Sequence, residues 1–578
     1  MSTTQRELVG SRHVATMIVA VVVLCLSPSL VSPQEAASSV EAALSDRFAS
    51  PPFRPPISTA LRFEDDLRRF YRARDYSPVW LSSTGREGRL DEFLVALSSA
   101  SQDGLTEEYG VAEVSWIFAS PGPLLPVSLA ELELRLSDAF LRLAHDLSRG
   151  RVDPRGLVGE WASAREPFDA VATLTQVAEL HSASSTLDGL RPSHPQYQAL
   201  REALASLRAV GEWVRVPSGA TLTEGDVDGR VVILRHRLTQ SGDLADDGDL
   251  ADDGALADDR APSADPAFFG PALEEAVRDF QRRHGLGVDG RVGAETLGAL
   301  NVPASERARQ VAANLERWRW LPNDLGSRRV MVNVPDFTVT VEGPELAPVR
   351  LRAIVGRTER ETPTFSSTIE SFSLAPYWNV PPNLARKDVL PNIREDTLYL
   401  DRVGMTVIDT GTRELIDGSS IDWATISDDE FLAHYRLRQE PGPANSLGDL
   451  RIAFPNPYTV FLHDTPARAL FEEDSRAFSS GCVRVERSFE LLDWLLNGDP
   501  EWTRERITEV LEAGQELSSR IREPVPIHVV YLTALVDEDG SLGFRPDVYG
   551  LDDALKQALM STTQVEVLYL EGPPKSGD

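Results

Sequence analysis

The sequence is poor in cysteine. Its 578 residues contain two, and one of these, Cys25, lies in an apolar run near the N-terminus. If that run belongs to an export leader, the mature chain keeps only Cys482 and cannot form an internal disulfide. A lone thiol in an exported protein is either a buried bystander or a nucleophile that is kept reduced for chemistry. The small residues before Cys482 and the cation at Arg484 favour the nucleophile.

Positive charge is also scarce. Lys and Arg number 58 against 89 Asp and Glu, which gives a formal net charge of -31. This charge repels nucleic acid phosphates and anionic lipid surfaces, so neither is a predicted partner. Part of it is local, because eight aspartates lie between Asp243 and Asp259 in a tandem six-residue repeat. The repeat lacks the period and the bidentate glutamate of an EF-hand loop, and we interpret residues 242–265 as a solvated low-complexity insert.

No apolar run reaches the roughly 20 residues that a membrane-spanning helix needs. The nearest is residues 14–26, with Arg6 and Arg12 before it and a Ser-Pro-Ser sequence after it. That order is the layout of a secretory leader. We therefore interpret residues 1–32 as a signal peptide or, if uncleaved, as an N-terminal anchor that makes the only predicted membrane contact.

Helical periodicity dominates the first half of the chain. After a Ser/Pro/Ala-rich linker over residues 33–56, we predict a helical scaffold domain over residues 57–215. Within it, residues 129–144 place leucines and a phenylalanine three or four apart on one face. A further helical segment over residues 219–302 contains three short helices, predicted at residues 231–238, 271–284 and 293–300.

From residue 327 the hydrophobic period changes to two. Val330, Val332 and Val334 alternate with other residues, as in strands with one buried face. Further strands are predicted at residues 371–374, 451–454, 459–462 and 527–532, and a helix at residues 488–496. We predict a β-rich domain over residues 327–557 and a tail over residues 558–578. The long connection over residues 383–433 is interpreted as a cap over a cleft.

The candidate chemistry centres on Cys482 and His463. A histidine is the base best matched to a thiol near neutral pH, and His463 closes a predicted strand nineteen residues before Cys482. Gly481 has no Cβ, so a substrate carbonyl can approach the backbone N–H groups around it, which suit an oxyanion. The helix that follows would favour a thiolate through its N-terminal dipole.

The sequence also suggests roles for the side chains of Arg484 and Asp464. The forked guanidinium of Arg484 suits a substrate carboxylate, and the alternative is a surface ion pair with Glu486 or Glu490. Asp464 follows His463 in a possible strand, so its side chain would point the other way, and a backbone carbonyl is the better candidate for orienting the imidazole.

These residues resemble the active site of the L,D-transpeptidases with a YkuD-type catalytic domain, most closely the long YcbB-like subgroup. Residues 463–466 read His-Asp-Thr-Pro, and residues 479–485 read Ser-Ser-Gly-Cys-Val-Arg-Val. The commonest short form has His where this chain has Ser480, and relatives often have Tyr where it has Phe461. The resemblance implies Cys482 as nucleophile, His463 as general base and acid, and Gly481 as an oxyanion-binding backbone. The implied substrate contacts are Arg484, Ser479, Ser480, Trp378 and Asn445.

The sequence of residues 276–297 resembles the three-helix peptidoglycan-binding domain, and the resemblance covers residues 219–302. Together the two resemblances imply an α+β multidomain protein with a helical N-terminal scaffold, a peptidoglycan-binding bundle and a β-rich YkuD-type catalytic domain. The implied location is the periplasm of a Gram-negative-type bacterium, with an inner-membrane anchor as the alternative.

The implied reaction joins two peptidoglycan stem peptides. A cysteine thioester forms on a donor tetrapeptide with release of D-Ala, and a second stem resolves it to give a 3-3 cross-link. No cofactor is implied, and no His, Cys or Asp cluster has the spacing of metal ligands. The implied partners are donor and acceptor stems and other wall synthases. Two alternatives stay open: a cysteine peptidase or carboxypeptidase acting on stems, and a non-catalytic peptidoglycan-binding protein.

Overall fold

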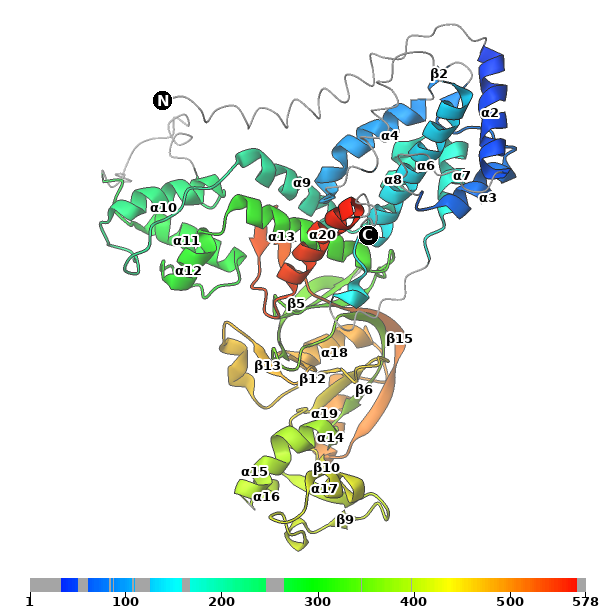
Figure 1. Ribbon diagram of the computed structural model, residues 1–578. Coiled ribbons are helices and arrows are strands. Elements are labelled where there is room, and N and C mark those ends of the chain that lie inside the picture. Colours follow the sequence, from blue (N-terminus) through cyan, green and yellow to red (C-terminus); the bar gives the residue numbers. More distant parts are fainter. Residues whose placement is uncertain are drawn as a thin grey trace, which may run out of the picture.

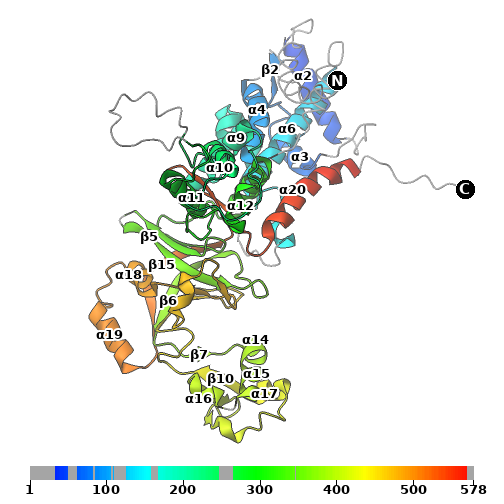
Figure 2. The same cartoon turned by 90° about the vertical axis from the view of Figure 1, so that its left-hand side faces the viewer.

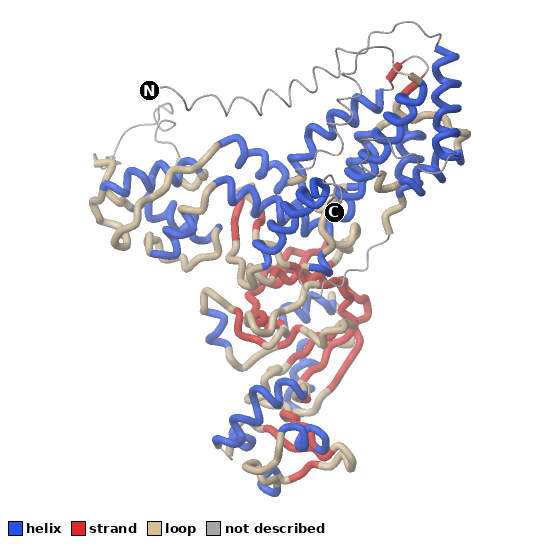
Figure 3. Tube along the Cα trace, in the orientation of Figure 1, coloured by secondary structure: helices blue, strands red, loops and turns tan. Residues whose placement is uncertain are grey.

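The computed structural model describes residues 33–49, 61–82, 85–86, 88–105, 109, 125–157, 167–245, 265–344, 346–396 and 398–568. The predicted leader and most of the acidic insert lie outside these ranges. Helices form one end of the molecule, a large sheet lies in the middle, and a small lobe forms the other end (Figure 1). Coloured by secondary structure, the chain shows the same separation of helices from strands (Figure 3). Within the described ranges, every helix is too short or too polar to cross a membrane.

The scaffold is helical, as predicted. Its long helix α6 buries Leu132, Leu136 and Phe140 along one face. The buried carboxylate of Glu133 on the same helix accepts hydrogen bonds from the Tyr71 hydroxyl at 2.8 Å and from the Trp80 amide at 3.1 Å. It thereby fixes the aromatic segment against α6. The scaffold helices are α2 (Pro33–Ala49), α3 (Glu64–Ala73), α4 (Gly88–Ser99), α6 (Pro126–Arg149), α7 (Ala170–Leu180), α8 (Ala183–Leu190) and α9 (Pro195–Val210).

The predicted linker over residues 33–56 is wrong for its first part. Residues Pro33–Ala49 form α2, which packs against α6 with Val40 and Leu44 buried. The segment is rich in alanine, which has the highest helix propensity, and its two buried residues are spaced i, i+4. Composition alone therefore predicts a linker where the structure has a helix that packs on the scaffold.

The predicted three-helix segment forms a small bundle of α10 (Gly229–Gln240), α11 (Pro271–Arg283) and α12 (Ala294–Leu300). The expected apolar positions of α11, including Val277 and Phe280, are buried in its core. Arg283 forms an ion pair with Asp243 and donates to the carbonyl of Leu542. The bundle is thereby docked against the C-terminal part of the chain.

Helix α13 (Ala304–Trp320) was not predicted. It is buried on most sides and packs against α9 and α20 (Leu551–Leu568). Its Glu316 accepts a hydrogen bond from the amide of Val152 at 2.8 Å, and Asn314 donates to the hydroxyl of Thr533 at 2.9 Å. Because arginines and polar residues are buried on this helix among aromatic ones, its sequence has no clear apolar stripe. It connects the scaffold to the central sheet.

The central sheet closes on itself. Its strand order is β13-β5-β14-β12-β11-β6-β15-β3-β4, and β4 also pairs with β5. The predicted helix at residues 488–496 is confirmed as α18 (Ser488–Leu496), which packs on this sheet together with α19 (Arg504–Ala513). The strands are β3 (Arg329–Asn333), β4 (Thr338–Gly343), β5 (Leu346–Gly356), β6 (Phe365–Leu374), β11 (Leu450–Ala453), β12 (Leu462–His463), β13 (Ala477–Ser479), β14 (Val483–Val485) and β15 (Leu517–Val530).

The segment predicted as a cap is a small lobe with its own core, built around Leu390, Val407 and Phe431. Its four strands have the order β7-β10-β8-β9, and it extends from the sheet on the side away from the scaffold (Figure 1). We call this lobe the cap. Its elements are β7 (Trp378–Asn379), α14 (Pro382–Leu384), a π-helical turn (Ala385–Val389), α15 (Leu390–Glu395), α16 (Tyr399–Arg402), β8 (Met405–Asp409), β9 (Leu415–Ile416), α17 (Asp428–His434) and β10 (Tyr435–Gln439).

After β15 the chain returns to the helical end. The hairpin of β16 (Ala534–Val536) and β17 (Leu542–Phe544) leads into α20, which lies beside the scaffold helices (Figure 2). The Arg317 guanidinium pairs with Asp552 in the buried contact between α13 and α20. Helix α20 is therefore part of the joint between scaffold and sheet.

Candidate active site

His463 ends β12, and Cys482 immediately precedes the neighbouring parallel strand β14. In the β12–β14 pair, His463 lies opposite Arg484. Side chains at paired positions share a face of the sheet, so His463 and Arg484 lie on the same face. Arg484 acts on the pKa of both His463 and Cys482, so the thiol and the imidazole lie near the same cation.

A backbone carbonyl orients the imidazole. His463 Nδ1 lies 2.5 Å from the carbonyl oxygen of Asp464, and the Asp464 side chain instead accepts hydrogen bonds from Arg468 and Ser488. This agrees with the expectation drawn from strand alternation. Burial and the nearby Arg484 cation lower the pKa of His463 to about 3. The ring is therefore neutral at physiological pH, and with its proton on Nδ1 it leaves Nε2 as a base.

The thiol is also neutral at rest. Cys482 is half-buried, and its Sγ lies 3.9 Å from the carbonyl oxygen of Thr459. Burial raises its pKa to about 11, although Arg484 and a backbone hydrogen bond act in the opposite direction. The expectation that a helix dipole favours a thiolate is wrong, because α18 begins only at Ser488, beyond the turn over which a dipole acts. The pair is a thiol and an imidazole, not an ion pair.

The turn before the thiol is held by its own hydrogen bonds. The Ser479 hydroxyl donates to the carbonyl of Cys482 at 2.6 Å and accepts from the amide of Gly481 at 3.1 Å. Gly481 has φ of +110°, which disfavours any residue with a Cβ. Its carbonyl accepts a hydrogen bond from Thr362 Oγ1 at 2.8 Å. Ser479 therefore shapes the turn, and its predicted substrate contact stays a prediction.

Arg484 has no partner of opposite charge among the described residues. The alternative of a surface ion pair is wrong, because Glu486 pairs with Arg352 and Glu490 pairs with Arg487. The Nε atom of Arg484 is buried without a hydrogen-bond partner. A half-buried guanidinium that lacks a carboxylate beside a thiol is suited to an anionic ligand.

A second arginine lies on the same face. Arg451 of β11 stands directly opposite His463, and its guanidinium lies 5.7 Å from the ring centroid of Phe461. It donates a long hydrogen bond of 3.4 Å to the Ser373 hydroxyl, and the ion pairs of the described residues do not include it. Two cations therefore flank the imidazole in a protein whose net charge is strongly negative.

Ser480 connects the turn to the cap. Its hydroxyl accepts a hydrogen bond from Arg360 Nη1 at 2.9 Å, and Arg360 Nη2 donates to Asp388 in the π-helical turn at 2.8 Å. The predicted cap thus contacts the loop that carries the thiol. Arg360 could not be predicted from local sequence, since its partners Asp388 and Ser480 lie 28 and 120 residues away.

Two predicted substrate contacts have other surroundings. Asn445 is buried and donates to the carbonyls of Pro376 and Glu440, while its Oδ1 accepts from the amide of Leu447. These bonds hold the loop that also contains Leu447, whose carbonyl is near His463, and the predicted contact of Asn445 with substrate stays a prediction. Trp378 packs, partly buried, against the core of the cap.

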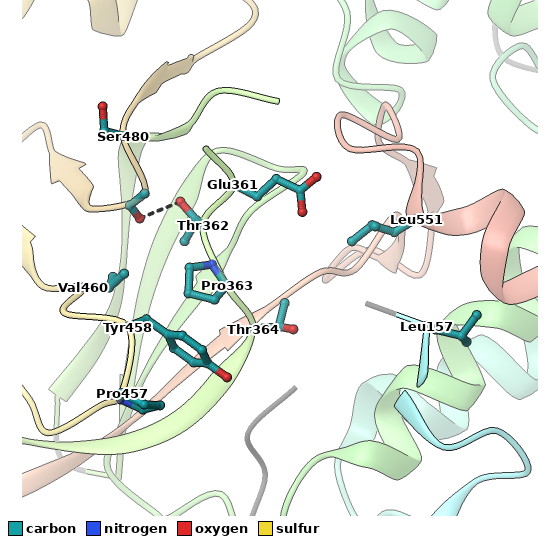
Figure 4. Close-up of a pocket in the computed structure, with 11 residues that line it drawn as sticks. Leu157, Glu361, Thr362, Pro363, Thr364, Pro457, Tyr458, Val460, Ser480 and Leu551 are labelled. Atoms are coloured by element: carbon teal, nitrogen blue, oxygen red, sulfur yellow. Dashed lines mark hydrogen bonds between the residues drawn. The ribbon is translucent and has the colours of Figure 1, made fainter. Parts of the chain in front are cut away.

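A cavity of about 670 Å³ reaches the turn that precedes Cys482. Eleven residues line it, among them Ser480 and Gly481 of the turn, Leu157 of the scaffold end and Leu551 of α20. Figure 4 shows residues 361–364 along one wall, with the Thr362 hydroxyl bonded to the Gly481 carbonyl. No described group of three His, Cys, Asp or Glu side chains is arranged to hold a metal ion.

Comparison with known proteins assigns the domains. Residues 327–503 match the YkuD family, described as "L,D-transpeptidase catalytic domain". Residues 228–300 match a "Putative peptidoglycan binding domain", and residues 65–204 match a "Scaffold domain". The chain therefore carries a catalytic domain of the YkuD L,D-transpeptidase family together with a peptidoglycan-binding domain and a scaffold domain.

Individual relatives are consistent with this family. A Haemophilus influenzae protein named "Putative L,D-transpeptidase" is 34% identical over 260 residues, which cover 44% of this chain and 51% of that protein. The chain thus spans about half the length of this curated relative. The crystal structure of an L,D-transpeptidase from Xylanimonas cellulosilytica is 15% identical and covers 54% of this chain and 98% of that one. Its TM-score is 0.16, too low to bear on the fold.

Proposed function

We propose that this protein is an L,D-transpeptidase that forms 3-3 cross-links in peptidoglycan through a thioester on Cys482. The observation that supports the proposal is that His463 ends β12 and Cys482 directly precedes the paired strand β14, within the segment that matches the YkuD family. Neither residue needs a charge at rest, because a neutral imidazole can take the thiol proton as the bond to substrate forms.

In the first step, Cys482 Sγ attacks the carbonyl of the third residue of a donor tetrapeptide. Its proton passes to His463 Nε2, and the carbonyl oxygen becomes an oxyanion held by backbone N–H groups around Gly481. The C–N bond to D-Ala then breaks. The leaving nitrogen takes the proton from His463, so D-Ala departs as a neutral amine and a thioester stays on the enzyme.

In the second step, the side-chain amine of an acceptor stem, after losing its ammonium proton to water, attacks the thioester carbonyl. The new N–C bond forms, the electron pair of the C–S bond returns to sulfur, and an amine proton reaches the sulfur through His463. The products are a cross-linked dimer and the free thiol, so the enzyme is restored.

Arg484 is proposed to bind a carboxylate of the donor. Its guanidinium has no carboxylate partner among the described residues and lies beside both reacting groups. The cap, held to Ser480 through Arg360, is proposed to exclude water so that an amine resolves the thioester. Ser479 and Trp378 stay candidates for substrate contacts.

The remaining domains fit action on a polymer outside the cytoplasm. The bundle of α10, α11 and α12 is proposed to hold peptidoglycan while the sheet domain acts on its stems. We propose a periplasmic location, with the N-terminal segment as leader or anchor, and cooperation with other wall synthases.

The test uses purified tetrapeptide muropeptides with native protein and with Cys482→Ala. Mass spectrometry should find 3-3 linked dimers and free D-Ala with native protein only. Shortened monomers without dimers would show a peptidase instead. Binding to peptidoglycan sacculi without any change of the muropeptides would show a binding protein.

A further inference from the structure

We propose that the segment just before β12 binds the sulfur of Cys482 through two backbone groups. The carbonyl of Thr459 accepts a hydrogen bond from the thiol, and the N–H of Phe461 donates one to the thiolate that forms during the reaction. Asn456 is the positioning residue that holds this segment in place. Such a sulfur site deepens the proposed function, on which it rests, because it stabilises the charge that develops on the nucleophile.

The first observation is that the parallel pairing of β12 with β14 stops one step before the thiol. The Val483 amide donates to the Phe461 carbonyl at 3.1 Å, as a parallel pair requires. Continued two residues towards the N-terminus, the same pattern would join Gly481 to the Thr459 carbonyl and the Phe461 amide. Gly481 instead turns away, because both its amide and its carbonyl bond to side chains, at 3.1 Å and 2.8 Å. The two backbone groups that it leaves are therefore available to another partner.

That partner is the sulfur of Cys482. Its Sγ lies 3.9 Å from the Thr459 carbonyl oxygen, within reach of a weak S–H donor. A hydrogen bond from the backbone of Phe461 lowers the pKa of the thiol, which is the effect of a donor that favours the charged form. One group suits the thiol and the other suits the thiolate, so the sulfur has a partner in both protonation states. The donor matters because burial otherwise disfavours the thiolate.

The second observation is a strained residue in the same segment and the side chain that fixes it. Thr459 has φ of +59°, a left-handed conformation that is rare for a β-branched residue and persists only where its surroundings impose it. Asn456 Nδ2 donates to the carbonyls of Phe454 and Val460, at 2.9 Å and 2.7 Å. Its Oδ1 accepts from the amides of Tyr458 and Val460, at 3.1 Å and 3.0 Å. Four hydrogen bonds from one side chain thus hold the turn that presents the Thr459 carbonyl to the sulfur.

The sulfur site acts at both acyl steps. When the thiol proton passes to His463, negative charge develops on the sulfur, and the Phe461 N–H stabilises it while the bond to the substrate carbonyl forms. When the C–S bond later breaks and its electron pair returns to sulfur, the same donor stabilises the leaving thiolate. Because the donor is held by the backbone, it is in place before the charge appears and needs no rearrangement during the reaction.

The first test removes a single backbone N–H. Replacing Phe461 by phenyllactic acid turns its amide into an ester and deletes only the donor to sulfur. Replacing Val483 by α-hydroxyisovaleric acid is the matched control, because the Val483 N–H donates to a carbonyl of the next step of the same pairing. Alkylation of Cys482 by iodoacetamide at about pH 9 should slow about tenfold in the first ester and at most about twofold in the second, since only the thiolate reacts. Equal rates in the two esters would overturn the sulfur site.

The second test addresses Asn456. Asn456→Ala should slow thioester formation from a tetrapeptide donor about tenfold, and the Phe461 ester should add little to this loss, because the N–H is already displaced. Effects that multiply to about a hundredfold would show that Asn456 acts independently of the donor and would overturn its positioning role. Thermal unfolding shows that each variant is folded at the assay temperature. Absence of any thioester in native protein would overturn the proposed function, whereas the alkylation rates would still decide the sulfur site.

Discussion

Arg360 of the catalytic sheet domain and Asp388 of the cap form an ion pair, with Nη2 and Oδ1 2.8 Å apart. The same guanidinium donates to Ser480, two residues before the thiol. The ion pair lowers the pKa of Asp388, so the carboxylate is charged under all ordinary conditions. Through these two contacts the position of the cap is coupled to the turn that carries Cys482.

Breaking this ion pair should loosen the cap. We expect Asp388→Ala to lower the ratio of cross-linked to hydrolysed product several-fold, because water gains access to the thioester. The rate of D-Ala release should change less. Muropeptide analysis by mass spectrometry gives both quantities, with Asp429→Ala as control, since Asp429 pairs with Arg386 within the cap. An unchanged ratio after Asp388→Ala would exclude water control by this contact.

Loss of Arg484 should weaken donor binding. We expect Arg484→Gln to raise the KM for a tetrapeptide donor by about tenfold or more, because a half-buried charge-assisted contact contributes about 1.5–3 kcal/mol. Arg487→Gln is the matched control, because Arg487 is exposed and pairs with Glu490. Steady-state kinetics of D-Ala release gives the KM of each variant. Equal KM values for the two variants would remove Arg484 from donor binding.

Gly481 should not tolerate a side chain. Its φ of +110° is accessible to glycine, and an added Cβ would lie 3.3 Å from the Glu361 carbonyl oxygen. We expect Gly481→Ala to cost about 1–3 kcal/mol of unfolding free energy and to slow acylation at least tenfold, since the oxyanion site moves. Gly298→Ala in α12, where the added methyl meets nothing within 4 Å, should leave both unchanged. Thermal unfolding measures the change in unfolding free energy, and acylation rates measure the effect on the reaction. A fully active Gly481→Ala variant would contradict the assignment of the oxyanion site.

The thiol should react slowly with alkylating agents at neutral pH. Because only the thiolate reacts and the pKa of Cys482 is about 11, alkylation by iodoacetamide should rise about tenfold per pH unit up to nearly pH 11. An unperturbed thiol, with a pKa of about 8.5, would level off above pH 9. Arg484→Gln should slow the reaction further, because that cation lowers the pKa. A plateau below pH 8 would indicate a thiolate–imidazolium pair.

Local patterns predicted much of this architecture. Alternation of valines from Val330 onwards identified the sheet domain, and the i, i+3, i+4 spacing around Val277 and Phe280 identified α11. Helix α13 was not predicted, because its buried side chains include Glu316 and Arg319, which pair with one another and with distant residues. Such pairs leave no periodic apolar pattern in the local sequence. Helix α2 lies where composition predicts a linker, since its alanines and serines have little hydrophobic contrast.

The sequence predicts the motif of the site but not the protonation states of its thiol and imidazole. The strand end at His463 and the small residues before Cys482 follow from the sequence. The neutral state of both groups does not, because it depends on burial beneath loops distant in the chain. The hydrogen bond from Asn445 to the carbonyl of Pro376 was also not predictable, because the two residues are 69 positions apart in the sequence.

The most direct test of the central claim is the intact mass of the protein during turnover of a tetrapeptide donor without acceptor. Native protein should gain the mass of the donor acyl group less D-Ala, located on Cys482 by peptide mapping, and the adduct should be absent in Cys482→Ala. His463→Ala should form it far more slowly. An adduct that persists in Cys482→Ala, or D-Ala release without dependence on this thiol, would contradict the account.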